Sequence, residues 1–316
     1  MKIAVFFVSS VLLSLSGDVC VADMMLNHSN KELKHIKILD QKQLSFNQID
    51  GVSVVELSDI AYDAGSGIVY FVGDEGALFS FRIALSDTIE SLVPLHAVKL
   101  KTKKGRKLRH AKRDSEGATM DNQGRLLISF EGKKPKIGWY DKDPKYMGTL
   151  LKKYKLPKRL KKKKYYRSRN KALESVAWHK TYGILTAAEL PLKKDNIKLQ
   201  TIYALSGKKW HFIAEPEKNS AVAAIEVMDD GNILVLERAY TNILSPFIIT
   251  LKKVFIKGCK QALCPTQVLL KMDNHKGWAV DNFEGLAKVG KNRYLMVSDD
   301  NKNFFQKTLL IYFEVR

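Results

Sequence analysis

The sequence has no long hydrophobic run after residue 22, and it contains only three cysteines among its 316 residues. A helix needs about 20 consecutive apolar residues to cross a bilayer, so no transmembrane span is expected within residues 23–316. A Gly-x-Ser-x-Gly motif is also missing, which argues against a serine-hydrolase elbow. The seven histidines are scattered, and none pairs obviously with a Ser or an Asp. A catalytic triad is therefore not expected.

Acidic residues are fewer than basic residues in this sequence. The chain has 33 Asp and Glu against 53 Lys and Arg, which gives a formal net charge of +20. Such a charge favours anionic partners: a membrane surface, nucleic acid, an acidic polysaccharide or a phosphorylated small molecule.

The N-terminus is typical of a signal peptide. Lys2 precedes an apolar run over residues 3–15, and small residues near Ala22 supply a cleavage site. We predict a signal peptide over residues 1–22, a mature chain over residues 23–316, and export to the periplasm or the medium. An uncleaved anchor is the alternative, but the apolar run is short for one.

Cleavage after Ala22 would remove Cys20 and leave Cys259 and Cys264, five residues apart. Two nearby cysteines in an exported protein predict one small local disulfide. The pair makes a poor zinc motif, because no histidine cluster lies near it.

Four segments share one repeated frame: an acid, a short apolar run, a turn rich in Asp, Asn and Gly, and a second apolar run that ends in another acid. The two acids are 15 residues apart in every case. The pairs are Asp59 and Asp74, Glu116 and Glu131, Glu174 and Glu189, and Glu284 and Asp299. A fifth segment, residues 222–237, has the second acid, Glu237, without the first.

Each segment has the pattern of a β-hairpin with its turn midway between the acids. Residues equidistant from a turn lie opposite each other in an antiparallel pair, so the two acids of each pair are expected side by side at the open end. Like charges placed there need a cation to stabilise them.

The hairpins recur about every 55 residues, and further strand-like runs follow them at residues 77–83, 137–140, 201–205 and 247–255. Only residues 308–315 follow the last hairpin, and residues 35–39 are expected to supply its missing outer strand. This predicts an all-β fold, a β-propeller of five or six blades with about four antiparallel strands each. An open sandwich or two separate β-domains would fit the regular period less well.

Two basic runs interrupt the repeats. Residues 99–113 hold nine Lys or Arg and residues 152–169 hold eleven, just before Glu116 and Glu174. Both runs are expected near the same mouth as the acids, which would suit a metal-bridged anionic substrate, phosphate above all. Solvated charged loops are the simpler interpretation. Nucleic-acid binding, with Tyr154, Tyr165 and Tyr166 as stacking residues, is a third interpretation, and the expected export argues against it.

The acid segments also resemble a known family. The matching stretches are Asp-Ser-Glu-Gly at residues 114–117, Asn-Lys-Ala-Leu-Glu at 170–174, Leu-Val-Leu-Glu-Arg at 234–238, Asp-Asn-Phe-Glu-Gly-Leu-Ala at 281–287 and Val-Ser-Asp-Asp-Asn at 297–301. Over residues 50–316 they resemble the phytase-like family, also called "esterase-like activity of phytase". The resemblance implies a secreted or periplasmic propeller, and its label suggests hydrolysis of phosphate or other esters. Lys171 departs from the pattern, which often has Gly there.

Carboxylates suit hard cations such as Ca²⁺ or Mg²⁺, so a metal-assisted ester hydrolase, phosphomonoesters favoured, is the first hypothesis and Ca²⁺ the expected cofactor. The expected residues are, as catalytic groups, Glu116, Glu174 and Glu284; for substrate, Arg169, Asn170, Arg238 and Asn301; and for metal, Glu131, Glu189, Glu237, Asp299 and Asp300. The alternative is a binding propeller without enzymatic activity that docks anionic polymers or lipids of the cell envelope through its basic loops.

Overall fold

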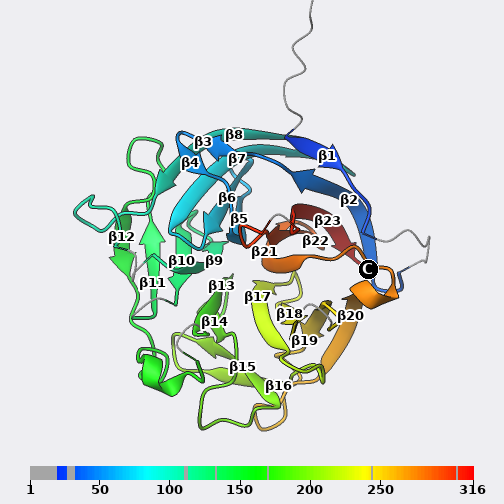
Figure 1. The fold of residues 1–316 in the computed structure, drawn as a ribbon. Helices are drawn as coiled ribbons and strands as arrows, with labels where there is room; N and C mark the ends of the chain where they lie inside the picture. Colours follow the sequence, from blue (N-terminus) through cyan, green and yellow to red (C-terminus); the bar gives the residue numbers. More distant parts are fainter. Residues whose placement is uncertain are drawn as a thin grey trace, which may run out of the picture.

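The computed structural model describes residues 20–26, 33–109, 113–131, 134–168, 171–242, 245–303 and 305–316. Within these residues the strands form five blades around a central axis, as Figure 1 shows. The predicted all-β propeller is therefore confirmed, with five blades rather than six. No helix in the described part of the chain is long and apolar enough to span a membrane.

Four blades are consecutive four-stranded antiparallel sheets. Blade 1 contains β5 (Leu57–Asp63), β6 (Ile68–Gly73), β7 (Ala77–Leu85) and β8 (Ile89–Lys99); blade 2 contains β9 (Ser115–Met120), β10 (Leu126–Phe130), β11 (Lys136–Tyr140) and β12 (Leu150–Lys153). Blade 3 contains β13 (Leu173–His179), β14 (Gly183–Ala188), β15 (Leu199–Ala204) and β16 (Lys209–Ile213); blade 4 contains β17 (Ala221–Val227), β18 (Ile233–Ala239), β19 (Ile248–Val254) and β20 (Thr266–Asp273).

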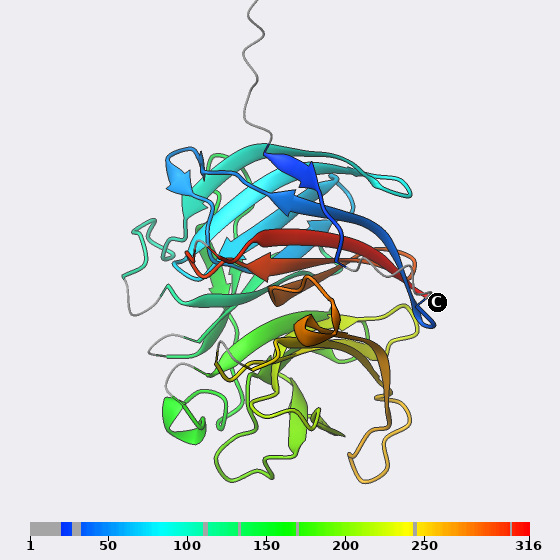
Figure 2. The ribbon, with the colours of Figure 1, turned by 45° about the vertical axis from the view of Figure 1, so that its right-hand side comes forward.

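Blade 5 joins the two ends of the described chain. Its strands are β21 (Asn282–Gly290), β22 (Arg293–Asp299) and β23 (Thr308–Val315), followed by β2 (Ile36–Leu44) and β1 (Val21–Asp23). β2 pairs with β23 along its whole length, and Figure 2 shows the two strands running together. The N-terminal strand thus closes the ring, as the sequence predicted. Residues 1–19 of the predicted signal peptide lie outside the described residues.

A few short elements lie outside the blade strands. They are the hairpin of β3 (Gln48–Ile49) and β4 (Val52–Ser53) and the 3-10 turns η2 (Lys163–Tyr165) and η3 (Asn274–Lys276). Cys259 and Cys264 form the predicted disulfide in the loop between β19 and β20.

The core lies between neighbouring blades. In β10, Leu126 and Ile128 pack toward blade 1, while Leu127 packs toward blade 3. Alternate side chains of a strand point to opposite faces, so each inner strand contributes to two such interfaces. This double burial explains why the inner strands are continuous apolar runs, and it leaves their ends to carry the polar groups.

Candidate functional site: an acidic mouth

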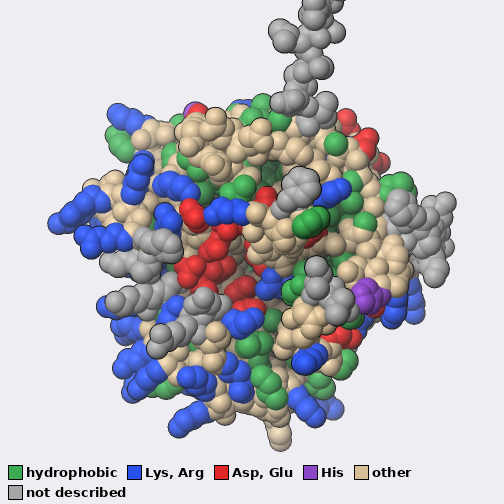
Figure 3. All heavy atoms as spheres, viewed as in Figure 1, with side chains coloured by type: hydrophobic (Ala, Val, Ile, Leu, Met, Phe, Trp, Pro, Cys, Tyr) green, Lys and Arg blue, Asp and Glu red, His purple; other side chains and the backbone are tan. Residues whose placement is uncertain are grey.

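One end of the central channel is lined with carboxyl groups. We call this group of eight the mouth acids: Asp74, Asp114, Glu116, Glu131, Glu174, Glu189, Glu284 and Asp299. They come from blades 1, 2, 3 and 5, at the ends of strands or beside them. Figure 3 shows Asp and Glu side chains gathered at the centre of this face, with Lys and Arg around them.

Every innermost strand has a β-bulge near its start. The pairing with the second strand skips one residue in each blade, and these residues are Ser58, Glu116, Glu174, Ala223 and Glu284. A bulge adds one residue to its strand and re-aims the side chains around it. The expectation that each acid pair lies directly opposite across its hairpin is therefore wrong. Glu131, for instance, lies opposite Asp114, whose carbonyl accepts its N–H at 3.1 Å, and not opposite Glu116.

A second position is equivalent in all five blades. It is the residue that lies across the hairpin from the residue two positions before the bulge. It is occupied by Asp74, Glu131, Glu189, Arg238 and Asp299 in blades 1 to 5. In blade 4 the register pairs Ala221 with Arg238, so Arg238, and not Glu237, stands where the other blades have acids.

Glu237 points away from the mouth acids. Its carboxylate forms an ion pair with Lys252 at 2.7 Å, and both side chains are almost fully buried. Lys252 also pairs with Glu215 at 2.7 Å and donates to the Ile213 carbonyl. The prediction that Glu237 belongs with the acids of the mouth is therefore wrong. In blade 4 the equivalent position is that of Arg238, one residue further along the chain.

Asp59 also lies apart from the mouth acids, and its carboxylate holds backbone segments together. Its buried carboxylate accepts backbone N–H groups from Ile60 at 2.8 Å, Ala118 at 2.7 Å and Leu286 at 2.9 Å. These donors belong to blades 1, 2 and 5, so one side chain ties three blades together near the axis. Burial raises the pKa of Asp59, while the three hydrogen bonds oppose that rise.

Glycines beside two bulged glutamates allow the blades to approach closely. A Cβ on Gly285 would lie 2.7 Å from the Asp59 Cα, and one on Gly117 would lie 2.8 Å from the Ser175 Cα. The Glu-Gly pairs at residues 116–117 and 284–285 thus combine a mouth acid with a position where only glycine fits.

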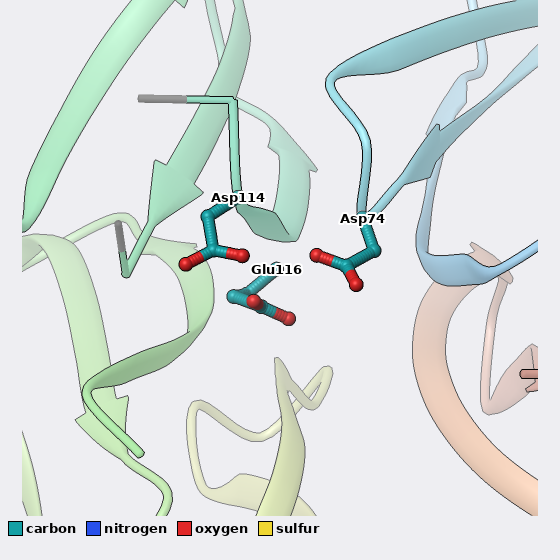
Figure 4. A group of neighbouring side chains, drawn as sticks. All are labelled: Asp74, Asp114 and Glu116. Carbon is teal, nitrogen blue, oxygen red and sulfur yellow. The ribbon is translucent and has the colours of Figure 1, made fainter. Parts of the chain in front are cut away.

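Asp74, Asp114 and Glu116 form the tightest acid group. One carboxylate oxygen from each lies within 4.8 Å of the others, and Figure 4 shows the three side chains converging from blades 1 and 2. Burial and the neighbouring Asp114 carboxyl raise the pKa of Asp74 to about 7. Burial, followed by repulsion from Glu174 and Glu131, raises the pKa of Glu116 well above its usual range.

Glu174 is also buried in the mouth. The residue is only 7% exposed, and none of the residues that the structure describes donates a hydrogen bond to its carboxylate or forms an ion pair with it. Burial and then the charges of Glu189 and Glu284 raise its pKa well above the usual range. Burial likewise raises the pKa of Glu131 to about 7 and that of Asp299 to about 8.

Two cations form ion pairs with mouth acids on the side of the channel that faces away from Asp74, Asp114 and Glu116. Arg238 forms ion pairs with Glu284 and, at 3.5 Å, with Glu189, and it also donates to the Asn282 side chain. Lys171 donates to Glu189 at 2.6 Å. Among the described cations, no other forms an ion pair with a mouth acid, so within the described residues only Glu189 and Glu284 of the eight carboxyls are ion-paired.

Parts of both basic runs reach the rim of the mouth. Arg113 and Lys99 lie 3.5 and 3.8 Å from Glu75, next to Asp74. Lys163 of the second run is close enough to Glu131 to oppose the rise of its pKa. The middle of the first run, residues 102–109, and the start of the second, residues 152–156 with Lys161, lie elsewhere, along the outer edge of blade 2.

The remaining predicted residues are placed as follows. Asp300 accepts the backbone N–H groups of Glu56 at 3.0 Å and Lys302 at 3.1 Å, so it holds a loop. Asn301 is exposed and donates its N–H to Asp299 at 2.7 Å. Arg169 and Asn170 lie outside the described residues.

Asp74 and Asp114 are site residues that the sequence did not predict. Asp74 could have been found because it completes the frame shared with Glu131, Glu189 and Asp299. Asp114 had a weaker signal, its place two residues before a bulged glutamate. Closely spaced carboxylate oxygens with few cations are the donors that a hard divalent cation prefers.

The fold and the site define a class: a five-bladed propeller whose central channel opens at an acidic mouth. The family model for "Phytase-like: Esterase-like activity of phytase" matches residues 52–302, and the chain belongs to this family. No curated protein matches the chain.

Several solved structures resemble it at low identity. The PQQ-bound aldose sugar dehydrogenase from Streptomyces coelicolor is 9% identical with a TM-score of 0.47, over 89% of this chain and 98% of that one. The WD40 propeller domain of Doa1 is 12% identical with a TM-score of 0.42, over 90% and 94%. A protein of unknown function from Bacteroides caccae is 10% identical with a TM-score of 0.40, over 84% and 82%.

Proposed function

We propose that the acidic mouth is the active site of a metal-assisted hydrolase that acts on phosphate or other esters. The observation that carries this proposal is the imbalance of charge, above all the buried Glu174 carboxylate that has no partner among the described residues. Buried carboxylates without partners either take up protons or bind a cation.

Asp74, Asp114 and Glu116 are the residues that would hold the cation. Their oxygens are close enough to share one ion, and an all-carboxylate set fits Ca²⁺ better than Zn²⁺. A bound divalent ion would polarise a phosphoryl or carbonyl oxygen and lower the pKa of a water molecule.

Glu174 is the best candidate for a general base. Burial and the neighbouring carboxylates raise its pKa, which strengthens the carboxylate as a base, and no described partner holds it in place. Glu284 is less available because it pairs with Arg238. Lys163, Lys171 and Arg113 stand around the mouth, where they would attract an anionic substrate, and Arg169 and Asn170 remain predicted substrate contacts.

Export is part of the proposal. It is supported by the apolar N-terminal run and by the disulfide between Cys259 and Cys264, which persists best in an oxidising compartment.

The test is an assay of the purified protein against p-nitrophenyl phosphate and p-nitrophenyl acetate, each with Ca²⁺ or with EDTA. We expect turnover that requires Ca²⁺ and that falls by about 100-fold or more in Glu174→Gln. The control is Glu226→Gln, because Glu226 lies near the opposite end of the channel, where its carboxylate accepts the Val227 N–H. Lack of turnover on either substrate, or turnover that ignores EDTA and Glu174→Gln, would overturn the proposal.

A further inference from the structure

A large groove runs along the outer edge of blade 2, apart from the mouth acids. Its volume is about 1530 Å³, and it lies between the loop that follows β8, the strand β12 and residues 154–161. This volume exceeds the usual range of small-molecule sites, about 300–1,000 Å³. The groove can therefore hold an extended ligand.

The lining of the groove is apolar at its base. Leu108, Pro135, Leu151, Tyr154 and Leu156 contribute to it, and Pro135 and Leu156 are buried. Leu108, Leu151 and Tyr154 are half-buried, so part of their apolar surface faces the groove. Water against such a surface is unfavourable, and an apolar chain would displace it.

The rim of the groove is strongly cationic. Eleven of its lining residues are Lys or Arg and none is acidic; they are Lys103, Lys104, Arg106, Lys107, Arg109, Lys134, Lys136, Lys152, Lys153, Lys155 and Lys161. Lys136 lies over the Phe130 ring at 3.7 Å. The other ten of these Lys and Arg residues form no ion pair with an acid in the described ranges.

Neither feature is explained by the fold alone. Lysines on an edge strand prevent pairing with other chains, which accounts for Lys152 and Lys153 on β12. It does not account for the cations of the loop after β8 or for Lys161, which repel one another across the groove. A simple polyanion would match the rim but would gain nothing from the apolar base.

We infer that this groove binds a phospholipid with an anionic headgroup, whose acyl chain lies on the apolar base and whose phosphate meets the Lys and Arg of the rim. Burial of such a chain against the apolar base removes its CH₂ groups from water, which favours binding. Several lysines and arginines around one phosphate supply charge-assisted hydrogen bonds. The inference goes beyond the proposed hydrolase, since the groove and the mouth acids share no residue.

The experiment is calorimetric titration of the purified protein with dihexanoyl-phosphatidylglycerol below its micelle concentration. Dihexanoyl-phosphatidylcholine, glycerol phosphate and polyglutamate serve as comparison ligands. We expect phosphatidylglycerol to bind about tenfold or more tightly than phosphatidylcholine, which lacks the net charge, and than glycerol phosphate, which lacks the chains. Its affinity should fall as salt is raised.

Two groups of variants separate the parts of the site. Leu108→Ser with Leu151→Ser should weaken phosphatidylglycerol by about tenfold and leave polyglutamate unchanged. Lys103, Lys104 and Lys107 changed together to Ala should weaken both anionic ligands. The matched control changes Lys180, Lys260 and Lys291 to Ala, three exposed lysines in loops at the opposite face.

The outcomes are distinct from those of the hydrolase assay, because no mouth acid is altered. Equal binding of the two lipids, glycerol phosphate binding as tightly as the lipid, or an equal loss in the control variant would overturn the inference. Polyglutamate binding that is as tight as the lipid and insensitive to the leucine variants would identify a plain polyanion surface instead. The lack of any measurable lipid binding would also refute it.

Discussion

The guanidinium of Arg238 in blade 4 forms an ion pair with the Glu284 carboxylate in blade 5. Arg238 occupies the position where the other four blades have Asp or Glu, and it also reaches Glu189 in blade 3. One substitution within the repeat thus neutralises one side of the mouth. The other side, with Asp74, Asp114 and Glu116, has no such cation among the described residues, and this asymmetry is why the proposed cation site is on that side.

Loss of Arg238 should destabilise the protein. Arg238→Gln leaves Glu284 and Glu189 without their shared cation, and breaking a buried pair costs about 3–5 kcal/mol. The Arg238 side chain is 20% exposed, so we expect about 2–4 kcal/mol in urea unfolding at pH 8. Arg238→Lys, which keeps the charge, should lose less. Equal losses in the two variants would show that packing, and not charge, gives Arg238 its role.

Stability without metal should fall as the pH rises. Asp74 and Glu131 have folded-state pKa values of about 7 and Asp299 of about 8, above the values near 4 expected in the unfolded chain. The folded protein therefore binds more protons, and the stability from these groups is complete below about pH 4 and lost as pH rises to about 8.

The measurement is the thermal midpoint in EDTA at several values between pH 6.5 and 8.5. Within this window Asp63 and Asp229, whose pKa values are lowered, stay charged, whereas Glu226, outside the mouth, has its pKa raised by burial to about 7 and adds to the fall. We expect the midpoint to fall with pH in EDTA and to recover at pH 8.5 when Ca²⁺ is added, because binding to the folded state stabilises it. A midpoint that rises with pH in EDTA would contradict this account of the mouth.

The close approach of blades 5 and 1 should not tolerate a methyl group at Gly285. An added Cβ would lie 2.7 Å from the Asp59 backbone and 2.5 Å from the Val297 side chain. Overpacking of this kind costs about 1–3 kcal/mol, so we expect Gly285→Ala to lower the free energy of unfolding by that amount. Gly65→Ala is the control, since its Cβ would meet only the Asp63 carboxylate, at 3.5 Å. Similar unfolding curves for both variants would refute the prediction.

Much of the fold could be predicted from the sequence because the acids and the turn residues of the repeat recur at a regular spacing. The 15-residue spacing located four hairpins, and the lack of an outer strand after residues 308–315 predicted that the N-terminal strand would close the ring. The disulfide followed from two nearby cysteines.

The candidate site was harder to predict, because a β-bulge has no clear sequence signature. The bulges at Glu116, Glu174 and Glu284 shift the register by one residue, which spacing alone cannot reveal. In blade 4 the bulged residue is Ala223, so no acid marked the frame and Glu237 was aligned in place of Arg238. Asp59 fits the acid frame but accepts the backbone N–H groups of Ala118 in blade 2 and Leu286 in blade 5, contacts that exist only when the blades have packed together.

The central claim, that the acidic mouth binds a divalent cation, is tested most directly by calorimetric titration of the metal-free protein with Ca²⁺ at pH 8. We predict saturable binding with a Kd below about 1 mM, weakened at least about tenfold in the double variant Asp114→Asn, Glu116→Gln and unchanged in Glu226→Gln. Lack of saturable binding, or binding that the double variant leaves intact, would contradict the account.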